Sequence, residues 1–407
     1  MSIQPPYFIQ DPNLTEAHVA LAEEVLQCGD TPAFLFSTPD YVIQSHQKLA
    51  DVHVSPDQDL SAWLKQAKLQ LQDTIQQGHP DALIMGGIPF SHAEDVNLMI
   101  MQQANYYQKL LFSQADYDLT HQYHSTSYIP SAEDFQQSVE TLVHALKNNL
   151  LDKAVLARIL HISFHQKIDI SKLYYNLSKH NPDGYNYAVA RNPQQEGWFV
   201  GASPELLIAK QQQRIWSKPV AGTLPRSADV AQDQYHAQQL LNSEKDQYEH
   251  ALVIEMIADQ LNPFCKQLHI PKQPSLIRTK RLWHLATQIE GTLKDEQTHV
   301  FDLVEKLHPT PAICGQPTDI ARKKIAELEP FNRELFAGTM GWADGCGNGE
   351  WSVTVRCARI FEHTARLFAG AGIVAASDPA AECNETAAKF RTVLDGFGLS
   401  PEQISKG

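Results

Sequence analysis

Residues 351–374, WSVTVRCARIFEHTARLFAGAGIV, contain the pattern on which the fold prediction depends. β-Branched, aromatic and other apolar residues dominate Trp351–Phe361 and Arg366–Val374, and the polar segment Glu362–Ala365 separates these two runs. Two such runs joined by a short polar segment predict a β-hairpin. Strands joined in this way are antiparallel.

The same arrangement recurs upstream. Glu205–Lys210 and Arg214–Val220 flank three glutamines and predict a second hairpin. Lys153–Phe164, KAVLARILHISF, predicts a long strand, and further strands are expected on both sides of the turn Asn181-Pro-Asp-Gly184 and over Leu282–Leu293. Hairpins outnumber strand–helix–strand crossovers, so we expect antiparallel rather than Rossmann sheets.

Helical periodicity marks the segments between these strands. The predicted helices are Asp59–Gln77, a helix from the capping residues Ser131–Asp134 to Leu150, one long helix over Ala231–Leu261, Val300–Leu307, and a last helix starting near Pro379. The polar segment Gln114–Ser127 is expected to be an exposed connection. The fold class is therefore an α/β (α+β) sandwich, with largely antiparallel sheets packed face to face and helices outside.

Composition excludes several classes of protein. The 407 residues carry 33 basic and 47 acidic side chains, a net charge of −14, which argues against general nucleic-acid or anionic-membrane binding. No stretch approaches the roughly 20 apolar residues of a membrane span, and the first ten residues lack the features of a signal peptide. Six cysteines without a CxxC pair predict reduced thiols and a cytoplasmic protein.

Lys153 opens the predicted strand and shares one face with Val155, Ala157 and Ile159. The commoner arrangement for such a lysine is a sheet edge with the amine in water. A buried amine would instead have a pKa lowered toward neutrality, which would allow it to act as a general base.

Glu205 lies between the turn Gly201–Pro204 and an apolar strand. A carboxylate at such a junction is most often a solvated turn residue. The alternative is a general acid, kept protonated because apolar surroundings disfavour its charged form.

Two pairs of carboxylates are spaced for one helix face each: Asp246 with Glu249, and Glu382 with Glu385. Taken singly, each pair is more often a solvated face. If the two faces met across a cleft, their oxygens would suit Mg²⁺, with waters and a substrate anion completing the octahedron.

A basic and glycine-rich set follows near the C-terminus. Arg356 offers a fork to a carboxylate, the turn Gly370-Ala371-Gly372 allows backbone N–H groups to approach an anion, and Lys389 lies in the last helix.

These residues fall within motifs of a known family. The chain resembles the chorismate-utilising enzymes, which include anthranilate synthase component I, and most closely the isochorismate synthases of siderophore (2,3-dihydroxybenzoate) pathways. The matching segments lie in order between about residues 150 and 392. They are KAVLAR (153–158), GASPELL (201–207), PVAGT (219–223), SEKDQYEH (243–250), LWHLAT (282–287), LHPTPA (307–312), ELEPF (327–331), RELF (333–336), GNGEW (347–351) and FAGAGIV (368–374).

The resemblance implies a fold, a cofactor and site residues. It implies one large sandwich in which residues 1–130 are a variable part that completes the catalytic region, 131–400. It implies Lys153 as the base that activates water for attack at C2 of chorismate, and Glu205 as the acid that protonates the departing C4 hydroxyl. Glu249 and Glu385 would be Mg²⁺ ligands, with Asp246 and Glu382 close by. The implied substrate-binding residues are Gly222, Thr223, His284, Ala312, Phe336, Arg356, Gly370, Ala371, Gly372 and Lys389.

Related activities remain as alternatives. Anthranilate synthases have glutamine where Lys153 stands and use ammonia, so no obligate glutamine amidotransferase partner is expected here, whereas a downstream isochorismatase is a possible partner. Salicylate synthases share the lysine and also eliminate pyruvate, and menaquinone pathways use isochorismate synthases too. An inactive chorismate-binding protein is the non-enzyme alternative. Cys314 stands where serine is usual, and we expect it to border the pocket and to make the enzyme sensitive to thiol reagents.

Overall fold

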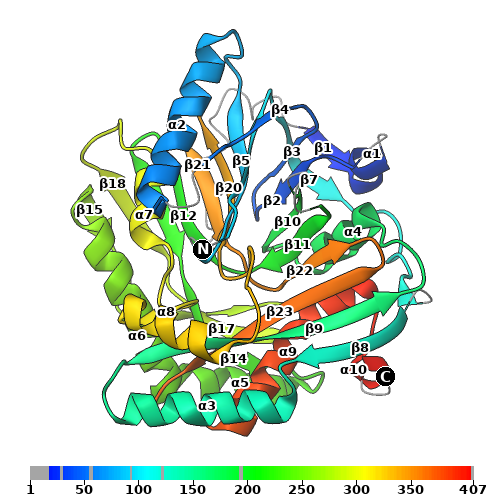
Figure 1. The fold of residues 1–407 in the computed structure, drawn as a ribbon, viewed down its shortest axis with the longest axis vertical. Helices are drawn as coiled ribbons and strands as arrows, with labels where there is room; N and C mark the ends of the chain where they lie inside the picture. The colour runs from blue at the N-terminus through cyan, green and yellow to red at the C-terminus, as the bar shows by residue number, and fades with distance from the viewer. Residues whose placement is uncertain are drawn as a thin grey trace.

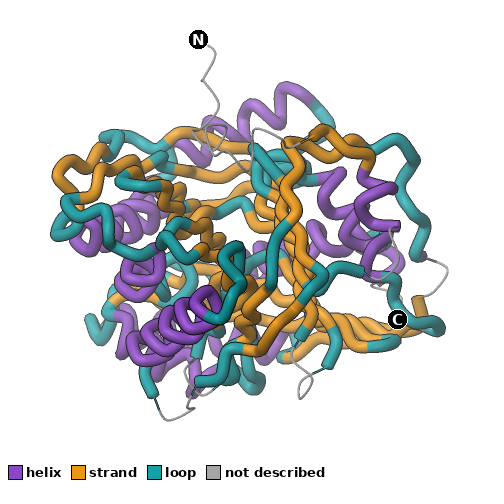
Figure 2. The backbone as a smooth tube through the Cα atoms, turned by 90° about the horizontal axis from the view of Figure 1, so that it is seen from above, coloured by secondary structure: helices purple, strands orange, loops and turns teal. Residues whose placement is uncertain are grey.

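The computed structural model describes residues 18–27, 31–54, 58–91, 94–120, 123–191 and 196–404. Two large sheets lie face to face with helices at the periphery, as Figures 1 and 2 show. The sandwich predicted from the sequence is therefore confirmed, and its strands are antiparallel except for one parallel pair, β1 with β7. Among the described residues, no helix combines the length and apolar composition needed to cross a bilayer.

The larger sheet has eleven strands, and many of its neighbouring strands come from distant parts of the chain. In spatial order they are β1 (His18–Leu21), β7 (Asn105–Leu111), β3 (Val42–Ser45), β2 (Phe34–Ser37), β10 (Tyr185–Ala190), β11 (Trp198–Ser203), β22 (Cys357–Phe361), β23 (Thr364–Ile373), β9 (Lys153–Phe164) and β19 (Gly315–Gln316), with β8 (Tyr123–Ile129) also paired to β9.

The second sheet has nine strands and the third has three. The nine are β15 (Cys265–His269), β18 (Ile289–Leu293), β13 (Arg214–Lys218), β12 (Leu206–Gln211), β21 (Gly349–Val353), β20 (Thr339–Asp344), β5 (Leu83–Ile88), β6 (Asn97–Met101) and β4 (Lys48–Asp51). The small sheet contains β14 (Val220–Pro225), β17 (Leu282–Ala286) and β16 (Ser275–Arg278).

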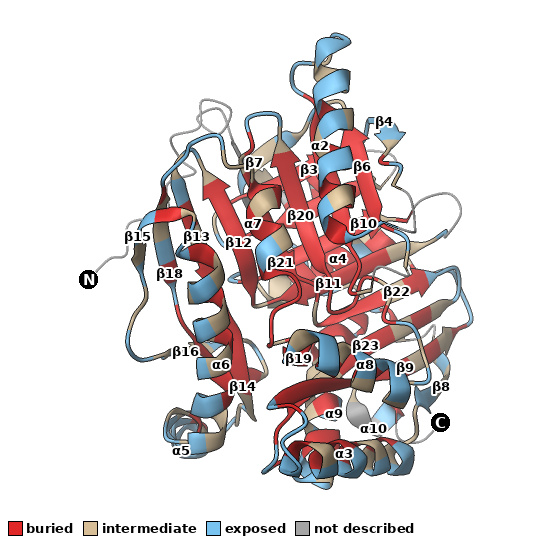
Figure 3. Cartoon of the chain, turned by 60° about the vertical axis from the view of Figure 1, so that its left-hand side comes forward, coloured by how far each residue is buried: buried red, intermediate tan, exposed pale blue. Residues whose placement is uncertain are grey.

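The helices pack on the outer faces of the sheets. In Figure 3 most of the strands are coloured as buried, whereas the helices also carry exposed residues. They are α1 (Ala22–Gln27), α2 (Leu60–Gln76), α3 (Ala132–Lys147), α4 (Ile170–His180), α5 (Val230–Leu241), α6 (Glu244–Leu261), α7 (Val300–Leu307), α8 (Thr318–Leu328), α9 (Pro379–Phe397) and α10 (Pro401–Ile404). One apolar core fills the space between the two large sheets, and a second lies between the larger sheet and α4 and α9.

The N-terminal part of the chain contributes strands to both large sheets. β2 pairs with β10, and β5 pairs with β20. Phe34 and Phe36 of β2 and Met85 of β5 belong to the core between the sheets. Residues 131–400 thus share their hydrophobic core with strands that precede residue 130.

The single long helix predicted over Ala231–Leu261 is wrong, because two helices meet at Asn242 and Ser243. Asn242 ends α5, and the Ser243 side chain accepts a hydrogen bond from the Asp246 backbone N–H, which caps α6. The apolar periodicity continues across this break, and only the capping serine marks it. The break sets the direction of α6, which carries Asp246 and Glu249.

The continuous strand predicted over Trp351–Phe361 is also wrong. β21 belongs to the nine-stranded sheet and β22 to the eleven-stranded sheet, so the chain crosses between them at residues 354–356. Arg356 has a φ of 52°, in the left-handed region that non-glycine residues rarely adopt. β22 and β23 do form the predicted hairpin.

The polar segment Gln114–Ser127 was expected to be a connection, but its end belongs to strand β8, which pairs with β9. The side chains of β8 are half-buried or exposed. A strand at a sheet edge can keep polar side chains, and for this reason the sequence does not show the apolar alternation of a strand.

Candidate active site

A small cavity of about 70 Å³ lies where the three sheets approach one another, beside α6 and α9. Its lining contains most of the residues implied by the sequence. These are Glu205, Gly222, Thr223, Glu249, His284, Ala312, Phe336, Arg356, Gly370, Gly372, Glu385 and Lys389. They come from positions as far apart as 205 and 389, so the fold brings together the separate motifs of the chain.

Four residues of the expected set do not line this cavity: Lys153, Asp246, Ala371 and Glu382. Three residues of β23, Ala369, Gly370 and Gly372, line the cavity, and Ala371 is not among the lining residues. The Ala371 side chain is fully buried in the core between the two large sheets. Of the other three, Lys153 bonds to Glu249, Asp246 lies against Gly222, and Glu382 is paired with Lys245.

Lys153 is fully buried, which excludes the arrangement with its amine in water. Its Nζ donates a hydrogen bond of 2.7 Å to Oε1 of Glu249. Gly372 lies directly beside this pair, because a Cβ at that position would be 3.0 Å from Lys153 Cε and would collide with Glu249 Oε1. Glycine is therefore needed at 372 to leave room for the ion pair.

Glu205 is 5% exposed, so it is not a solvated turn residue. Burial raises the pKa of its carboxyl to about 8, against the opposing effects of the Val220 backbone N–H and the charges of Lys153, Arg356 and Lys389. The group is mostly protonated at pH 7, as a general acid requires.

The carboxylates of α6 and α9 approach each other across the site. Burial raises the pKa of Asp246, and the nearby charges of Glu249 and Glu385 raise it further. Burial also raises the pKa of Glu382, as does Glu385. For Glu249, burial acts in the same direction but is outweighed by Lys153 and two other lysines, so its pKa is lowered.

This set of carboxylates fits a magnesium ion in its chemistry. Oε2 of Glu382 is buried without a hydrogen-bond partner, and the mutual repulsion of the carboxylates would be relieved by a cation. Within the described part of the chain, no three His, Cys, Asp or Glu side chains are grouped as a ready metal site. Mg²⁺ generally needs only one or two protein carboxylates, with water and substrate supplying the rest.

The lining also contains two cationic groups, Lys389 and Arg356. Lys389 Nζ donates to the Gly370 carbonyl at 2.8 Å and lies 2.6 Å from Glu385 Oε1. Arg356 Nη2 lies 3.5 Å from Nε2 of His284, whose Nδ1 lies 3.1 Å from the Gly222 carbonyl. The carbonyl can only accept, so Nδ1 carries the proton, and burial keeps the pKa of His284 well below its usual value.

Two further groups contribute to this site without a local sequence signal that reveals them. Lys245 lies 2.7 Å from Oε1 of Glu382 and neutralises part of the acidic set. The backbone N–H of Val220 bonds to the Glu205 carboxyl. Lys245 falls one residue before Asp246 in a quoted motif, so its position was available, but its contact joins α6 to α9 and has no local pattern.

Comparisons with known proteins identify the family of the chain. Residues 56–398 match the family model described as "Chorismate binding enzyme". The chain is 38% identical over 388 residues to isochorismate synthase DhbC of Bacillus subtilis, which covers 93% of this chain and 96% of the relative. It is 37% identical over 345 residues to the vibriobactin-specific isochorismate synthase of Vibrio cholerae, covering 83% of this chain and 85% of the relative.

A crystal structure of DhbC from Bacillus anthracis superposes with a TM-score of 0.87 at 38% identity, over 93% of this chain and 100% of that chain. The matches extend well beyond the individual motifs. The chain therefore belongs to the family of chorismate-binding enzymes.

Cys314 follows the lining residue Ile313 but does not itself line the cavity, which corrects the expectation that it borders the pocket. The residue is fully buried, and burial raises the pKa of its thiol to about 11. Cys346, by contrast, is exposed. Cys28 lies outside the described residues.

The difference in exposure between Cys346 and Cys314 predicts a selective reaction with iodoacetamide at pH 8. We expect Cys346 to be alkylated at least about tenfold faster than Cys314, because only an accessible thiolate reacts. Peptide mass spectrometry at timed intervals would measure both rates, and Cys346→Ser should remove the fast phase. Equal rates at the two residues would contradict the burial of Cys314.

Proposed function

We propose that this chain is an isochorismate synthase that converts chorismate to isochorismate in siderophore biosynthesis. The observation that carries the proposal is a buried, protonated glutamate, Glu205, in the cavity lining and a buried lysine, Lys153, bonded to another lining residue, Glu249. A site that holds a base and an acid together suits a reaction that removes one proton and supplies another. The names of its relatives support the same activity.

In the proposed reaction, Lys153 takes a proton from the water that adds at C2, and Glu205 gives its proton to the hydroxyl that leaves C4. The ring double bonds shift between these positions, so the product is an isomer and no redox partner is needed. Lys153 can accept a proton only when its amine is neutral and released from Glu249 Oε1, its present hydrogen-bond partner.

The cationic part of the lining suits a substrate with two carboxylates. Arg356 and Lys389 offer charge-assisted hydrogen bonds, and Gly370 and Gly372 leave the β23 backbone accessible at the cavity wall. Thr223, His284, Ala312 and Phe336 complete the surface beside the ring. Burial lowers the pKa of Arg356 to about 10, so it remains cationic at neutral pH.

Mg²⁺ is the cofactor that we propose for this site. Glu249 from α6 and Glu385 from α9 would hold it at the cavity, with Asp246 and Glu382 behind them. When bound, the ion would neutralise a carboxylate of the substrate. Glu249 now forms an ion pair with Lys153, and Glu385 forms one with Lys389. Binding of Mg²⁺ would therefore be accompanied by release of both carboxylates from these lysines.

The base position holds Lys153, so we propose that no glutamine amidotransferase is required and that an isochorismatase acts downstream. Residues 1–130 would be a structural part of the catalytic unit, given the pairing of β2 and β5 with later strands. The five described cysteines are all free, which suits the reducing cytoplasm.

Product analysis with two variants tests the assigned roles. Wild-type protein with chorismate and Mg²⁺ should give an equilibrium mixture of chorismate and isochorismate, separable by chromatography, without pyruvate. Lys153→Ala and Glu205→Gln should each lower kcat by about 10²–10⁴-fold, because each removes one proton-transfer group.

Circular dichroism serves as the control that both variants keep the fold. Wild-type turnover in either variant would refute its role. Formation of salicylate and pyruvate would identify the protein as a salicylate synthase. Binding of chorismate without turnover would favour the non-enzyme alternative, an inactive chorismate-binding protein.

The raised pKa of Glu205 predicts the pH dependence of kcat/KM. A general acid works only while protonated, so kcat/KM should fall about tenfold per pH unit above a midpoint near pH 8. The folded carboxyl has the higher pKa, so activity is present below this midpoint and lost above it. Initial rates between pH 6.5 and 9.5 would measure the profile, and unchanged circular dichroism would exclude unfolding. A flat profile would contradict the assignment.

Metal binding can be measured without turnover, by calorimetric titration of Mg²⁺ into the protein. Glu249→Gln and Glu385→Gln should each weaken binding by at least about tenfold, because each removes a charged oxygen donor. Glu255→Gln is the matched control, since Glu255 is an exposed residue of the same helix as Glu249. Excess EDTA should abolish turnover of the wild-type enzyme. Equal affinity in all four proteins would rule out this ligand set.

A further inference from the structure

A second and larger cavity, of about 580 Å³, lies outside the active site. Lys218, Arg226, Arg278, Lys280 and His180 line it, together with a single acidic residue, Asp183. Neither the family motifs nor the proposed reaction uses these side chains. Its volume falls within the roughly 300–1,000 Å³ of small-molecule sites.

The charge at this cavity is positive, although the chain as a whole has a net charge of −14. Arg226 is neutralised by Asp233, with Nη2 and Oδ2 2.8 Å apart. Lys218, Arg278 and Lys280 form no ion pair with any acidic side chain in the described ranges. In the cavity lining three cations therefore share one carboxylate, Asp183, with Asp40 as a further acidic neighbour of Lys218, and an anionic ligand would supply the remaining counter-charge.

Lys218 lies at the end of β13 and is partly buried, unlike an ordinary surface lysine. Burial lowers the pKa of its amine, and the charges of Asp183 and Asp40 only partly oppose this effect. An amine in such surroundings interacts more strongly with an anion than it would in bulk water, because less solvent screens the charges.

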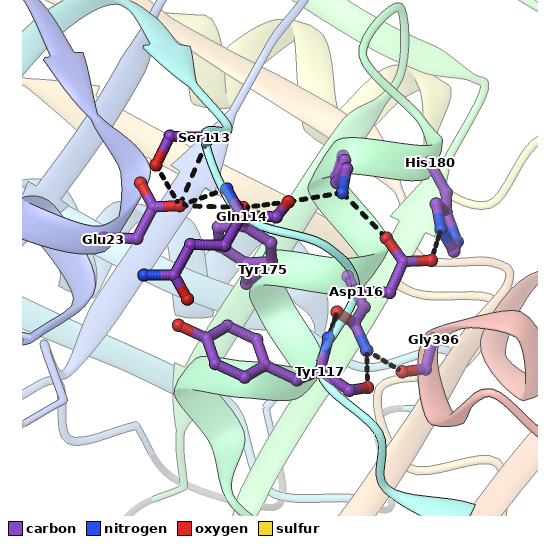
Figure 4. Close-up of polar contacts among 10 residues, drawn as sticks. Glu23, Ser113, Gln114, Asp116, Tyr117, Tyr175, His180 and Gly396 are labelled. Carbon is purple, nitrogen blue, oxygen red and sulfur yellow. Dashed lines mark hydrogen bonds and ion pairs between the residues drawn. The ribbon is translucent and has the colours of Figure 1, made fainter.

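His180 adds a polar group that is fixed in place. Its Nε2 lies 2.6 Å from Oδ2 of Asp116, which also forms an ion pair of 3.0 Å with Lys179; Figure 4 shows the first of these contacts. The side chain of His180 is only 10% exposed, and its Nδ1 is buried without a hydrogen-bond partner in the described structure. Buried polar atoms in proteins are usually hydrogen-bonded, so we expect Nδ1 of His180 to gain a hydrogen-bond partner when a ligand is bound.

We propose that this cavity is a second ligand site, which binds a small organic molecule carrying at least two negative charges. Lys218, Arg278 and Lys280 would bind its anionic groups. Pro182, Pro204 and Ile277 supply an apolar wall for the body of the molecule. Phosphate and carboxylate groups share the required chemistry, and the test below separates them.

The proposed site adjoins the active site without being part of it. Ser203 and Pro204 line the second cavity, and the next residue, Glu205, lines the first. Lys218 is paired with Leu206 in the β-ladder, and its chain continues through Pro219 to Val220, another residue of the first cavity. A ligand bound here would therefore contact both strand ends that hold the carboxyl of Glu205.

Calorimetric titration without metal, in about 0.15 M salt, tests this proposal with two probes, inorganic pyrophosphate and citrate. We expect at least one of them to bind the wild-type protein. The triple variant Lys218→Gln/Arg278→Gln/Lys280→Gln should bind it at least tenfold more weakly. The control variant Lys65→Gln/Lys147→Gln/Lys323→Gln loses the same total charge from exposed residues elsewhere and should bind like the wild type.

The comparison of probes identifies the ligand class: tighter binding of pyrophosphate indicates phosphate groups, and tighter binding of citrate indicates carboxylates. Saturating chorismate should leave the binding unchanged, and displacement by chorismate would overturn the proposal. No binding of either probe at 10 mM, or equal binding by the two triple variants, would also overturn it. If the first triple variant does not fold, Arg278→Gln/Lys280→Gln, at two exposed positions, provides the same comparison. No step measures turnover, so this test is independent of the proposed function.

Discussion

The arrangement of the active site depends on one buried ion pair, between Lys153 at the start of β9 and Glu249 in α6. Two charges removed from water are stable only when each compensates the other, and loss of one partner from such a pair costs about 3–5 kcal/mol. The pair therefore ties α6 to the eleven-stranded sheet at one point. It also explains Gly372, since any side chain there would occupy the space of the two charged groups. The break between α5 and α6 at Ser243 is needed for this ion pair, because it directs the helix that carries Glu249 toward β9.

Two glutamates at the same cavity have opposite protonation behaviour, and their neighbours explain the difference. Both are buried, and burial alone would raise both pKa values. Glu249 receives a direct hydrogen bond from a lysine, so its charged form is favoured. Glu205 has only the Val220 N–H and more distant cations, which do not overcome burial. One site can thus contain both an acid and an anionic ligand for a cation, although the two side chains are chemically identical.

Much of this fold could be predicted from local sequence patterns. The strand at Lys153–Phe164, the hairpin of β22 and β23, and the face shared by Lys153, Val155 and Ala157 follow from alternation, which depends on neighbouring residues alone. The crossing at Arg356 could not be predicted in this way, because the β-rich pattern is uninterrupted while the chain leaves one sheet and enters the other. The positions of the site residues came from motifs, whereas the burial of Lys153 and Glu205 depends on segments that lie far away in the chain. From composition, the solvated alternatives for both residues were the commoner ones, and only tertiary packing excludes them.

The small size of the first cavity has a consequence for binding. At about 70 Å³ it is well below the usual volume of a ligand site, and two of its carboxylates are already paired with lysines. Lys389 lies against Glu385, and Lys153 against Glu249, so the two lysines occupy the carboxylates that we assign to a cation. A dianion and a cation that entered together would each take over one side of these pairs, and their own charges would compensate each other in the buried site. A single anion or a single cation would leave its counterpart unpaired in a buried site, at a cost of several kcal/mol per charge. The internal pairing therefore favours joint occupancy of the site by substrate and metal, and it does so through electrostatics alone.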